Sequence, residues 1–263
     1  MKYIFLILSI CCFCNAAQAV VKGKEVSYEA DGVALKGYLA YDDAIKGKRP
    51  AVLVVHELWG LNDYARSRAR MLAELGYIAL AVDMYGNGKV AETPIEASKL
   101  AADLNRDIDL EQFRFLAGYD FLLKQENVDT SQIAALGYGF GGSVVLNMAR
   151  IGVNLKGVAS FYGGLDKNFP GKPKNGKPQI ISFTGEDDSF ITADKVAAFK
   201  LEMKYSGANY RVVTYPGAKH AFTNPDADEM GKKFNLPFAY NAAADTDSWE
   251  QTKVFLREVF SAK

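Results

Sequence analysis

The sequence predicts an α/β domain with a mostly parallel central sheet, helices on both faces and an antiparallel hairpin at its N-terminal end. Three observations predict this class. Short apolar runs alternate with segments of helical periodicity along most of the chain. Polar or glycine-rich segments follow the ends of several apolar runs. The pair Asp31-Gly32 lies between two strand-like segments and favours a two-residue hairpin turn.

The first three expected strands lie close together in the sequence. Glu25–Ala30 and Val33–Ala40 flank the hairpin turn and form the antiparallel pair. The run Ala51–Val55 is wholly apolar and follows Pro50, which indicates a buried strand. We therefore expect the parallel part of the sheet to begin there.

The first helix is bounded by residues of the expected types. Asn62 is a suitable N-cap, the apolar pattern reaches Leu75, and Gly76 ends the helix. The apolar run Ile78–Val82 follows and predicts a second buried strand. This strand–helix–strand order is typical of a parallel pair.

The rest of the chain repeats this alternation. Further strands are expected at Ile133–Leu136, Gly157–Phe161, Gln179–Phe183 and Tyr210–Tyr215. Helices are expected near Pro94–Leu104, Leu110–Lys124, Ser143–Arg150, Ala193–Tyr205 and Asp247–Phe260. The segment Pro170–Pro178 (PGKPKNGKP) is expected to be a surface loop.

The N-terminal segment is typical of a secretory signal. Lys2 supplies a positive charge, Tyr3–Cys14 is almost entirely apolar, and Ala17-Gln18-Ala19 matches a cleavage site. We expect residues 1–19 to be a signal peptide cleaved after Ala19, and residues 20–263 to form a single domain. The expected location is periplasmic or secreted. All three cysteines lie within residues 1–19, so the mature chain would carry no thiol.

The composition argues against two classes of partner. Lys and Arg number 31, as do Asp and Glu, so the formal net charge is zero. A balanced chain has no basic excess to attract nucleic acid or an anionic membrane. We expect neither as a partner after signal cleavage. We also expect no cofactor and no metal site, because His56 and His220 are the only histidines and show no ligand spacing.

The glycine turn ALGYGFGG (Ala135–Gly142) allows two interpretations. Gly137, Gly139 and Gly142 form G-x-G-x-x-G after a strand and before a helix, the pattern of a dinucleotide-binding loop. Asp166 lies in the range where a ribose-binding carboxylate is expected. A dinucleotide-binding oxidoreductase is therefore an alternative.

The other interpretation is a nucleophile elbow, G-x-Nu-x-G, in which a strand-to-helix turn presents a nucleophile above the sheet. An elbow predicts an acid and then a histidine at later strand ends. The strand Gln179–Phe183 is followed by Asp188, and Tyr210–Tyr215 is followed by His220. Ligands of parallel sheets bind beyond these carboxyl ends, which favours a shared site.

The motifs GYGFGG, HELWGLN, DMYGNG, GEDDSFI and YPGAKHAFTNP resemble the dienelactone hydrolase family of α/β-hydrolases over most of residues 20–263. The family's elbow is G-Y-C-F-G-G, so Gly139 stands at the position of its catalytic cysteine. The resemblance implies the α/β-hydrolase fold, with Asp188 as the acid, His220 as the base and Glu57 as the carboxylate near the nucleophile. It assigns the oxyanion hole to the backbone N–H groups of Phe140 and Leu58.

Some side chains allow both a structural and a functional interpretation. Trp59, Tyr85 and Phe222 are expected to line an apolar substrate pocket, although aromatic residues at such positions also form core. Glu57 is either an acid–base group or a solvated loop carboxylate. His56 is expected to be structural.

The sequence therefore supports three functions. The first is a hydrolase of small-molecule ester or lactone bonds whose activity is weak or lost, since Gly139 offers no nucleophile. The second is a non-catalytic protein that binds a small carboxylate ligand at the helix N-terminus. The dinucleotide-binding oxidoreductase is the third.

Overall fold

The computed structural model describes residues 21–166 and 178–262. The expected signal peptide and most of the segment Pro170–Pro178 lie outside the described residues. Within the described ranges, no helix is both long enough and apolar enough to cross a membrane.

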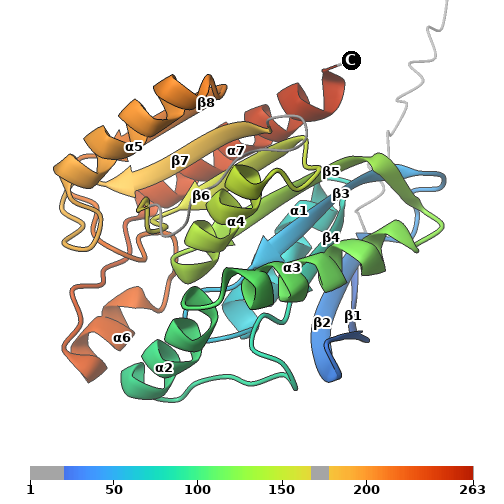
Figure 1. The fold of residues 1–263 in the computed structure, drawn as a ribbon, viewed down its shortest axis with the longest axis horizontal. Helices are drawn as coiled ribbons and strands as arrows, with labels where there is room; N and C mark the ends of the chain where they lie inside the picture. The colour runs from blue at the N-terminus through green and yellow to red at the C-terminus, as the bar shows by residue number, and fades with distance from the viewer. Residues whose placement is uncertain (1–20, 167–177, 263) are drawn as a thin grey trace, which may run out of the picture.

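Eight strands form one sheet in the order β1-β2-β4-β3-β5-β6-β7-β8 (Figure 1). The strands β1 and β2 pair antiparallel, β2 and β4 pair antiparallel, and the remaining neighbours pair parallel. The strands are β1 (Val21–Ala30), β2 (Val33–Asp42), β3 (Arg49–Val55), β4 (Ile78–Val82), β5 (Val128–Tyr138), β6 (Gly157–Phe161), β7 (Gln179–Gly185) and β8 (Tyr210–Tyr215). The predicted α/β-hydrolase fold is confirmed.

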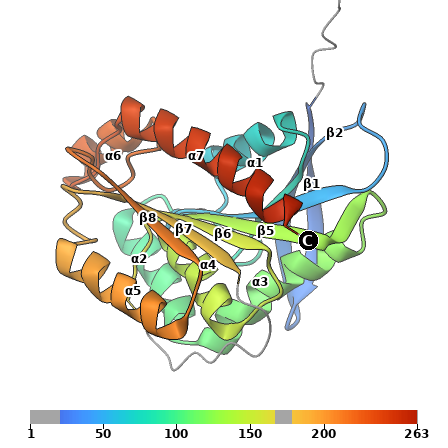
Figure 2. The ribbon, with the colours of Figure 1, turned by 90° about the horizontal axis from the view of Figure 1, so that it is seen from above.

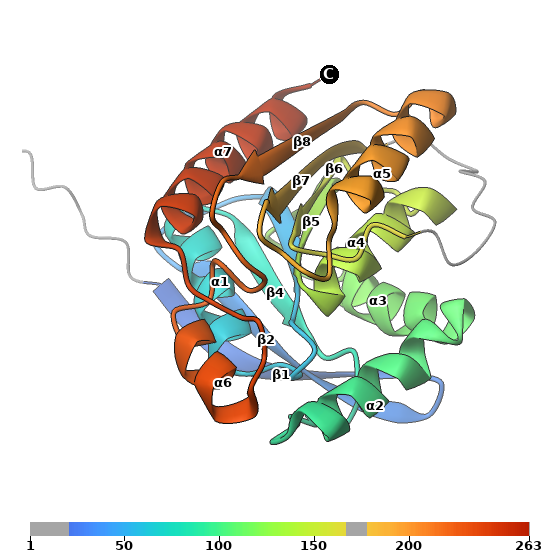
Figure 3. The same ribbon diagram turned by 90° about the vertical axis from the view of Figure 1, so that its left-hand side faces the viewer.

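Helices cover both faces of this sheet (Figures 2 and 3). One face carries α1 and α7, and the other carries α3, α4 and α5, with α2 packed beside α3. The helices are α1 (Asp63–Glu74), α2 (Pro94–Asn105), α3 (Ile108–Leu123), α4 (Phe140–Ile151), α5 (Ala193–Ser206), α6 (Ala227–Phe234) and α7 (Ala242–Ser261).

The central strands are apolar along their whole length because both of their faces are covered. Successive residues of a strand point to opposite faces. In β3, Leu53 packs in the core cluster that contains Val144 of α4, whereas Val54 packs in the cluster that contains Leu72 of α1. All of these side chains are fully buried. The two clusters, one on each face of the sheet, hold the strands and therefore their ends at fixed positions.

The hairpin at the N-terminal edge forms as predicted. Asp31 and Gly32 both have positive φ, 48° and 70°, and Ala30 faces Val33 across the turn. A turn of this kind needs two residues that tolerate left-handed backbone, which Asp and Gly do.

Several elements differ from the sequence prediction. Strands β1 and β5 begin earlier than predicted, at Val21 rather than Glu25 and at Val128 rather than Ile133. Helix α6 was not predicted, because its eight residues contain too few apolar side chains for a clear period. Its apolar partner is Trp59, from a distant loop. Helix α7 begins at Ala242 rather than Asp247, because Asn241 accepts a hydrogen bond from the Ala244 N–H and caps the helix earlier.

Candidate active site

His220 and Asp188 meet beyond the carboxyl ends of β8 and β7. Nδ1 of His220 lies 2.9 Å from Oδ2 of Asp188. The other oxygen of Asp188 accepts hydrogen bonds from the N–H groups of Phe190 and Ile191, at 2.8 Å and 3.2 Å. Asp188 is only 3% exposed. Asp188 therefore organises the turn before α5 and holds the imidazole at the same time.

Gly139 occupies the sharp turn between β5 and α4. Its backbone has φ 53° and ψ −115°, outside the helical and extended regions, and its N–H donates to the Phe161 carbonyl at 2.9 Å. Glycine adopts a positive φ without the penalty that a Cβ atom imposes. Next to it, the N–H of Gly141 donates to the carbonyl of His56 at 3.1 Å. The turn is thus attached to both neighbouring strands.

The glycine pattern is explained by packing within this turn. A Cβ atom on Gly137 would lie 2.0 Å from the carbonyl oxygen of Gly141, and one on Gly142 would lie 2.7 Å from Oγ of Ser160. The sheet order also differs from that of the dinucleotide-binding fold, and Asp166 pairs with Lys195 at 2.8 Å. The oxidoreductase interpretation is therefore wrong: the glycines belong to an elbow.

The elbow faces the imidazole. An ideal Cβ on Gly139 would lie 3.7 Å from Nε2 of His220 and 3.6 Å from Cε2 of Tyr162, which are ordinary contact distances. A side chain at position 139 would therefore be directed toward the imidazole nitrogen that is not bound to Asp188. The structure brings together Gly139, His220 and Asp188, which the sequence places in one site.

A cavity of about 360 Å³ opens beside this group. Its wall includes Gly139, Phe140, His220 and Leu58, and most of the remainder is apolar. The other lining residues are Pro94, Ser98, Ser143, Tyr162, Gly164, Phe190, Ile191, Lys195, Leu236 and Phe238. Among these described residues no arginine is present, and the ammonium of Lys195 is paired with Asp166. The cavity suits a small, mainly apolar molecule.

The two expected oxyanion donors lie on this cavity wall. Phe140 is the first residue of α4, so its N–H is among the four N-terminal groups that have no acceptor within the helix. The Leu58 carbonyl accepts a hydrogen bond from the hydroxyl of Tyr85 at 2.8 Å, which holds that loop in place. Both residues line the same cavity as Gly139.

Glu57 is buried beneath the cavity rather than solvated. Its side chain accepts hydrogen bonds from the Tyr162 hydroxyl at 3.1 Å and the Asn224 amide at 2.7 Å. Burial raises the pKa of this carboxyl group above its usual value, and the two hydrogen bonds oppose the shift. The interpretation of Glu57 as a solvated loop carboxylate is therefore wrong. Whether it takes part in catalysis stays a prediction.

His56 has the structural surroundings that the sequence predicts. Its Nδ1 lies 2.5 Å from the Glu57 carbonyl, and its Nε2 accepts from the N–H of Met84 at 3.3 Å. These contacts assign the proton to Nδ1. Burial lowers the pKa of His56, which keeps the ring neutral. In the described residues, no group of three or more His, Cys, Asp or Glu side chains is placed to hold a metal ion.

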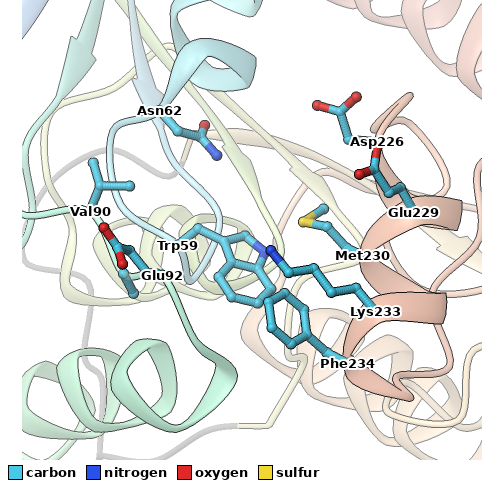
Figure 4. A pocket seen from close by; sticks show the side chains of 10 residues that line it. Trp59, Asn62, Val90, Glu92, Asp226, Glu229, Met230, Lys233 and Phe234 are labelled. Carbon is cyan, nitrogen blue, oxygen red and sulfur yellow. The ribbon is translucent and has the colours of Figure 1, made fainter.

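The three aromatic residues expected to line the pocket lie elsewhere. Tyr85 packs its ring against His56 and Phe140. Phe222 is fully buried against the ring of Tyr162. Trp59 stacks on Phe234 and lines a second cleft of about 290 Å³ beside α6 (Figure 4). All three pack against residues of the cavity wall: Tyr85 against Phe140, Phe222 against Tyr162, and Trp59 in the cluster that includes Leu58 and Phe238.

Tyr162 and Phe238 are site residues that sequence reasoning missed. Tyr162 directly follows β6, and the carboxyl end of a parallel strand is a position where site residues are expected. Phe238 comes from the chain after α6, which folds back over the site. A β-bridge joins His220 to Phe238, and their rings lie 5.1 Å apart. No local pattern in the sequence predicts this return.

The comparison with family models decides the assignment. The model of the dienelactone hydrolase family matches residues 35–260. The chain belongs to this family. Proteins that are similar to it over nearly their whole length include Protein usf of Aquifex pyrophilus, which is 28% identical over 241 residues (90% of this chain, 98% of the relative). A Saccharolobus solfataricus protein named "Putative carboxymethylenebutenolidase" is 29% identical over 272 residues, with the same coverage.

Solved structures of similar proteins agree with the fold. A dienelactone hydrolase-like promiscuous phosphotriesterase from metagenomic libraries has a TM-score of 0.85 and 31% identity, and the match covers 92% of this chain and 99% of that one. A Thermogutta terrifontis esterase has a TM-score of 0.58 and 18% identity, covering 94% of this chain and 95% of that one, a likeness of fold alone. The family places the chain among hydrolases of small-molecule esters and lactones.

Proposed function

We propose that this chain hydrolyses carboxylic ester or lactone bonds of small molecules, and that it does so weakly because position 139 is glycine. Membership of the dienelactone hydrolase family supports the reaction class. The mainly apolar cavity supports a small substrate with little charge. The described lining residues include no arginine, which argues against a substrate that is recognised through a carboxylate group of its own.

The single observation that carries the proposal is the position of His220. Its Nδ1 is bound to Asp188, while its Nε2 faces position 139 and the cavity. Asp188 fixes the tautomer that leaves Nε2 free to accept a proton. With no side-chain nucleophile, His220 would take a proton from a water molecule as that water attacks the ester carbonyl.

The rest of the reaction follows from the cavity wall. The N–H groups of Phe140 and Leu58 would stabilise the oxyanion that forms on the carbonyl oxygen. His220 would then return its proton to the leaving oxygen. Hydrolases stripped of a triad member keep a rate roughly 10³–10⁴-fold above the uncatalysed reaction, which sets the expected scale here.

One observation favours a second candidate function. Gly139 leaves space between the N-terminus of α4 and His220, where a carboxylate or a small acyl group would fit. In this case the protein would bind such a ligand without turnover. The two candidates share a cavity and differ only in whether bonds are broken.

Ester hydrolysis by matched variants separates them. The mature protein, Gly139→Cys and His220→Ala should be assayed with a short-chain aryl ester. Hydrolysis by the unmodified protein that disappears in His220→Ala would support water activation. Gly139→Cys should add a faster reaction that also depends on His220. If the unmodified protein is inactive but binds carboxylates, the binding function is favoured; if the cysteine variant gains nothing, the elbow assignment fails.

We also propose that residues 1–19 direct the chain to the periplasm or out of the cell. The apolar stretch and the Ala17-Gln18-Ala19 site support this location. N-terminal sequencing of the protein expressed in a bacterium should give Val20 as the first residue. A first residue of Met1 in the fractionated, soluble protein would contradict export.

A further inference from the structure

The space at Gly139 has the chemical surroundings of a binding site for a small thiol. Three groups define it: the elbow backbone, the imidazole of His220 and the ring of Tyr162, whose edge lies 3.6–3.7 Å from an ideal Cβ. Sulfur makes favourable contacts with aromatic rings, often at the ring edge. Phe140 also lines the cavity at this point.

The acid–base chemistry also favours a thiol over water. The pKa of an ordinary thiol is about 8.5, far below the pKa of bulk water. An imidazole therefore removes a proton from a thiol far more readily than from water. A thiolate is also intrinsically a strong nucleophile. Nε2 of His220 faces the elbow and is held in that orientation by Asp188.

We propose that this site takes its nucleophile from solution, and that it transfers acyl groups from esters to small thiols. The inference rests on the proposed ester-cleaving function. The S–H proton passes to Nε2 of His220 as the sulfur bonds to the ester carbonyl carbon. The N–H groups of Phe140 and Leu58 hold the oxyanion. The C–O bond then breaks, the leaving oxygen takes the proton from His220, and the products are a thioester and an alcohol.

Size limits which thiols qualify. The cavity of about 360 Å³ must hold the ester and the thiol together. The thiol is also not bonded to the backbone, so its sulfur stands further from the Gly139 Cα than a cysteine sulfur would. A thiol with one or two carbon atoms satisfies both conditions, whereas a tripeptide thiol does not. Methanethiol should therefore react at this site, whereas glutathione should not.

The test measures S-methyl thioacetate by mass spectrometry when the mature protein acts on 4-nitrophenyl acetate with methanethiol. The reaction without protein is subtracted. Thioester formation should saturate with methanethiol and should not occur with glutathione above the solution rate. His220→Gln should lower the protein-dependent rate by about 100-fold or more. Gly139→Cys should hydrolyse the ester without added thiol.

A matched pair of variants tests the location. Gly139→Ala adds a methyl group between the Gly139 Cα and the thiol sulfur, which would displace the thiol and should abolish saturation. Gly217→Ala is the control, because Gly217 also has a positive φ, 72°, but nothing lies within 4 Å of its Cβ position; its thiol reaction should be unchanged. Saturable thioester formation that persists in Gly139→Ala or His220→Gln would overturn the inference. His220-dependent hydrolysis with no thioester would overturn it too, while leaving the proposed function in place.

Discussion

Nδ1 of His220 lies 2.9 Å from Oδ2 of Asp188, although 32 residues separate them in the chain. The pair forms because β7 and β8 are parallel neighbours, so their carboxyl ends reach the same edge of the sheet. The second oxygen of Asp188 binds two backbone N–H groups of the turn before α5. One carboxylate therefore has an orienting contact and a structural contact, and the two can be separated by substitution.

Asp188→Asn should keep the structural contacts of residue 188 and lose its orienting contact with His220. The amide oxygen can still accept from the N–H groups of Phe190 and Ile191, so the turn should keep its stability. The amide cannot hold His220 in the same tautomer, and ester cleavage by Gly139→Cys should fall by up to about 10⁴-fold in the double variant. Asp188→Ala should lose the turn contacts as well and lower the midpoint of urea unfolding. Equal stability losses for Asn and Ala would contradict this division of roles.

Tyr162→Phe should destabilise the fold. Its hydroxyl donates to buried Glu57, and it also lies 3.1 Å from Oγ1 of Thr223. Removal leaves a buried carboxylate with one fewer donor, and the free energy of unfolding should fall by about 1–3 kcal/mol. Urea unfolding measures the loss. Tyr205→Phe is the control, since Tyr205 is 82% exposed and should change stability little; equal effects of the two substitutions would argue against the buried network.

Glu111→Gln should change how stability depends on pH. Glu111 is 1% exposed, and burial raises its pKa from 4.5 to about 7, although the Asn147 amide donates to it. The folded state therefore binds the proton more tightly than the unfolded state does. This contribution is present below pH 4.5 and is lost as pH rises through about 7.

The glutamine variant cannot ionise, so it should lack that loss. Relative to the parent, its free energy of unfolding should be higher by roughly 2.5 kcal/mol at about pH 8 than at about pH 5. Urea unfolding at both pH values measures this change. The control is Glu126→Gln, because Glu126 is exposed. The same difference from the parent at both pH values would mean that Glu111 does not titrate as described.

Gly137→Ala should damage the elbow sterically. Its Cβ would lie 2.0 Å from the Gly141 carbonyl oxygen, so the backbone must move. We expect a stability loss of at least about 1–3 kcal/mol and a loss of ester cleavage in the Gly139→Cys background. Gly217→Ala has open space and should show only the penalty of its positive φ, about 1–2 kcal/mol, with cleavage intact. Full activity in Gly137→Ala would show that the turn is less tightly packed than described.

Much of the fold could be predicted because its signals are local. The strands Ile78–Val82, Gly157–Phe161 and Tyr210–Tyr215 have the predicted bounds. The first two are fully buried apolar runs, which mark strands that are covered on both faces. The order of elbow, acid and histidine was also visible. Helix α6 could not be predicted in the same way, because a short helix with few apolar residues depends on partners elsewhere in the chain.

The sequence by itself determined the alternation of strands and helices, the hairpin turn at Asp31-Gly32 and which strand ends carry chemical groups, because these depend on the periodicity and residue type of short segments. Only the tertiary structure decided which groups meet. In the folded chain, Glu57 is buried beside Tyr162, and Phe238 packs against His220. Trp59, Tyr85 and Phe222 pack against the residues that line the cavity. The physical reason is that burial and contact depend on how segments far apart in the chain pack together, which the local pattern of any one segment does not determine.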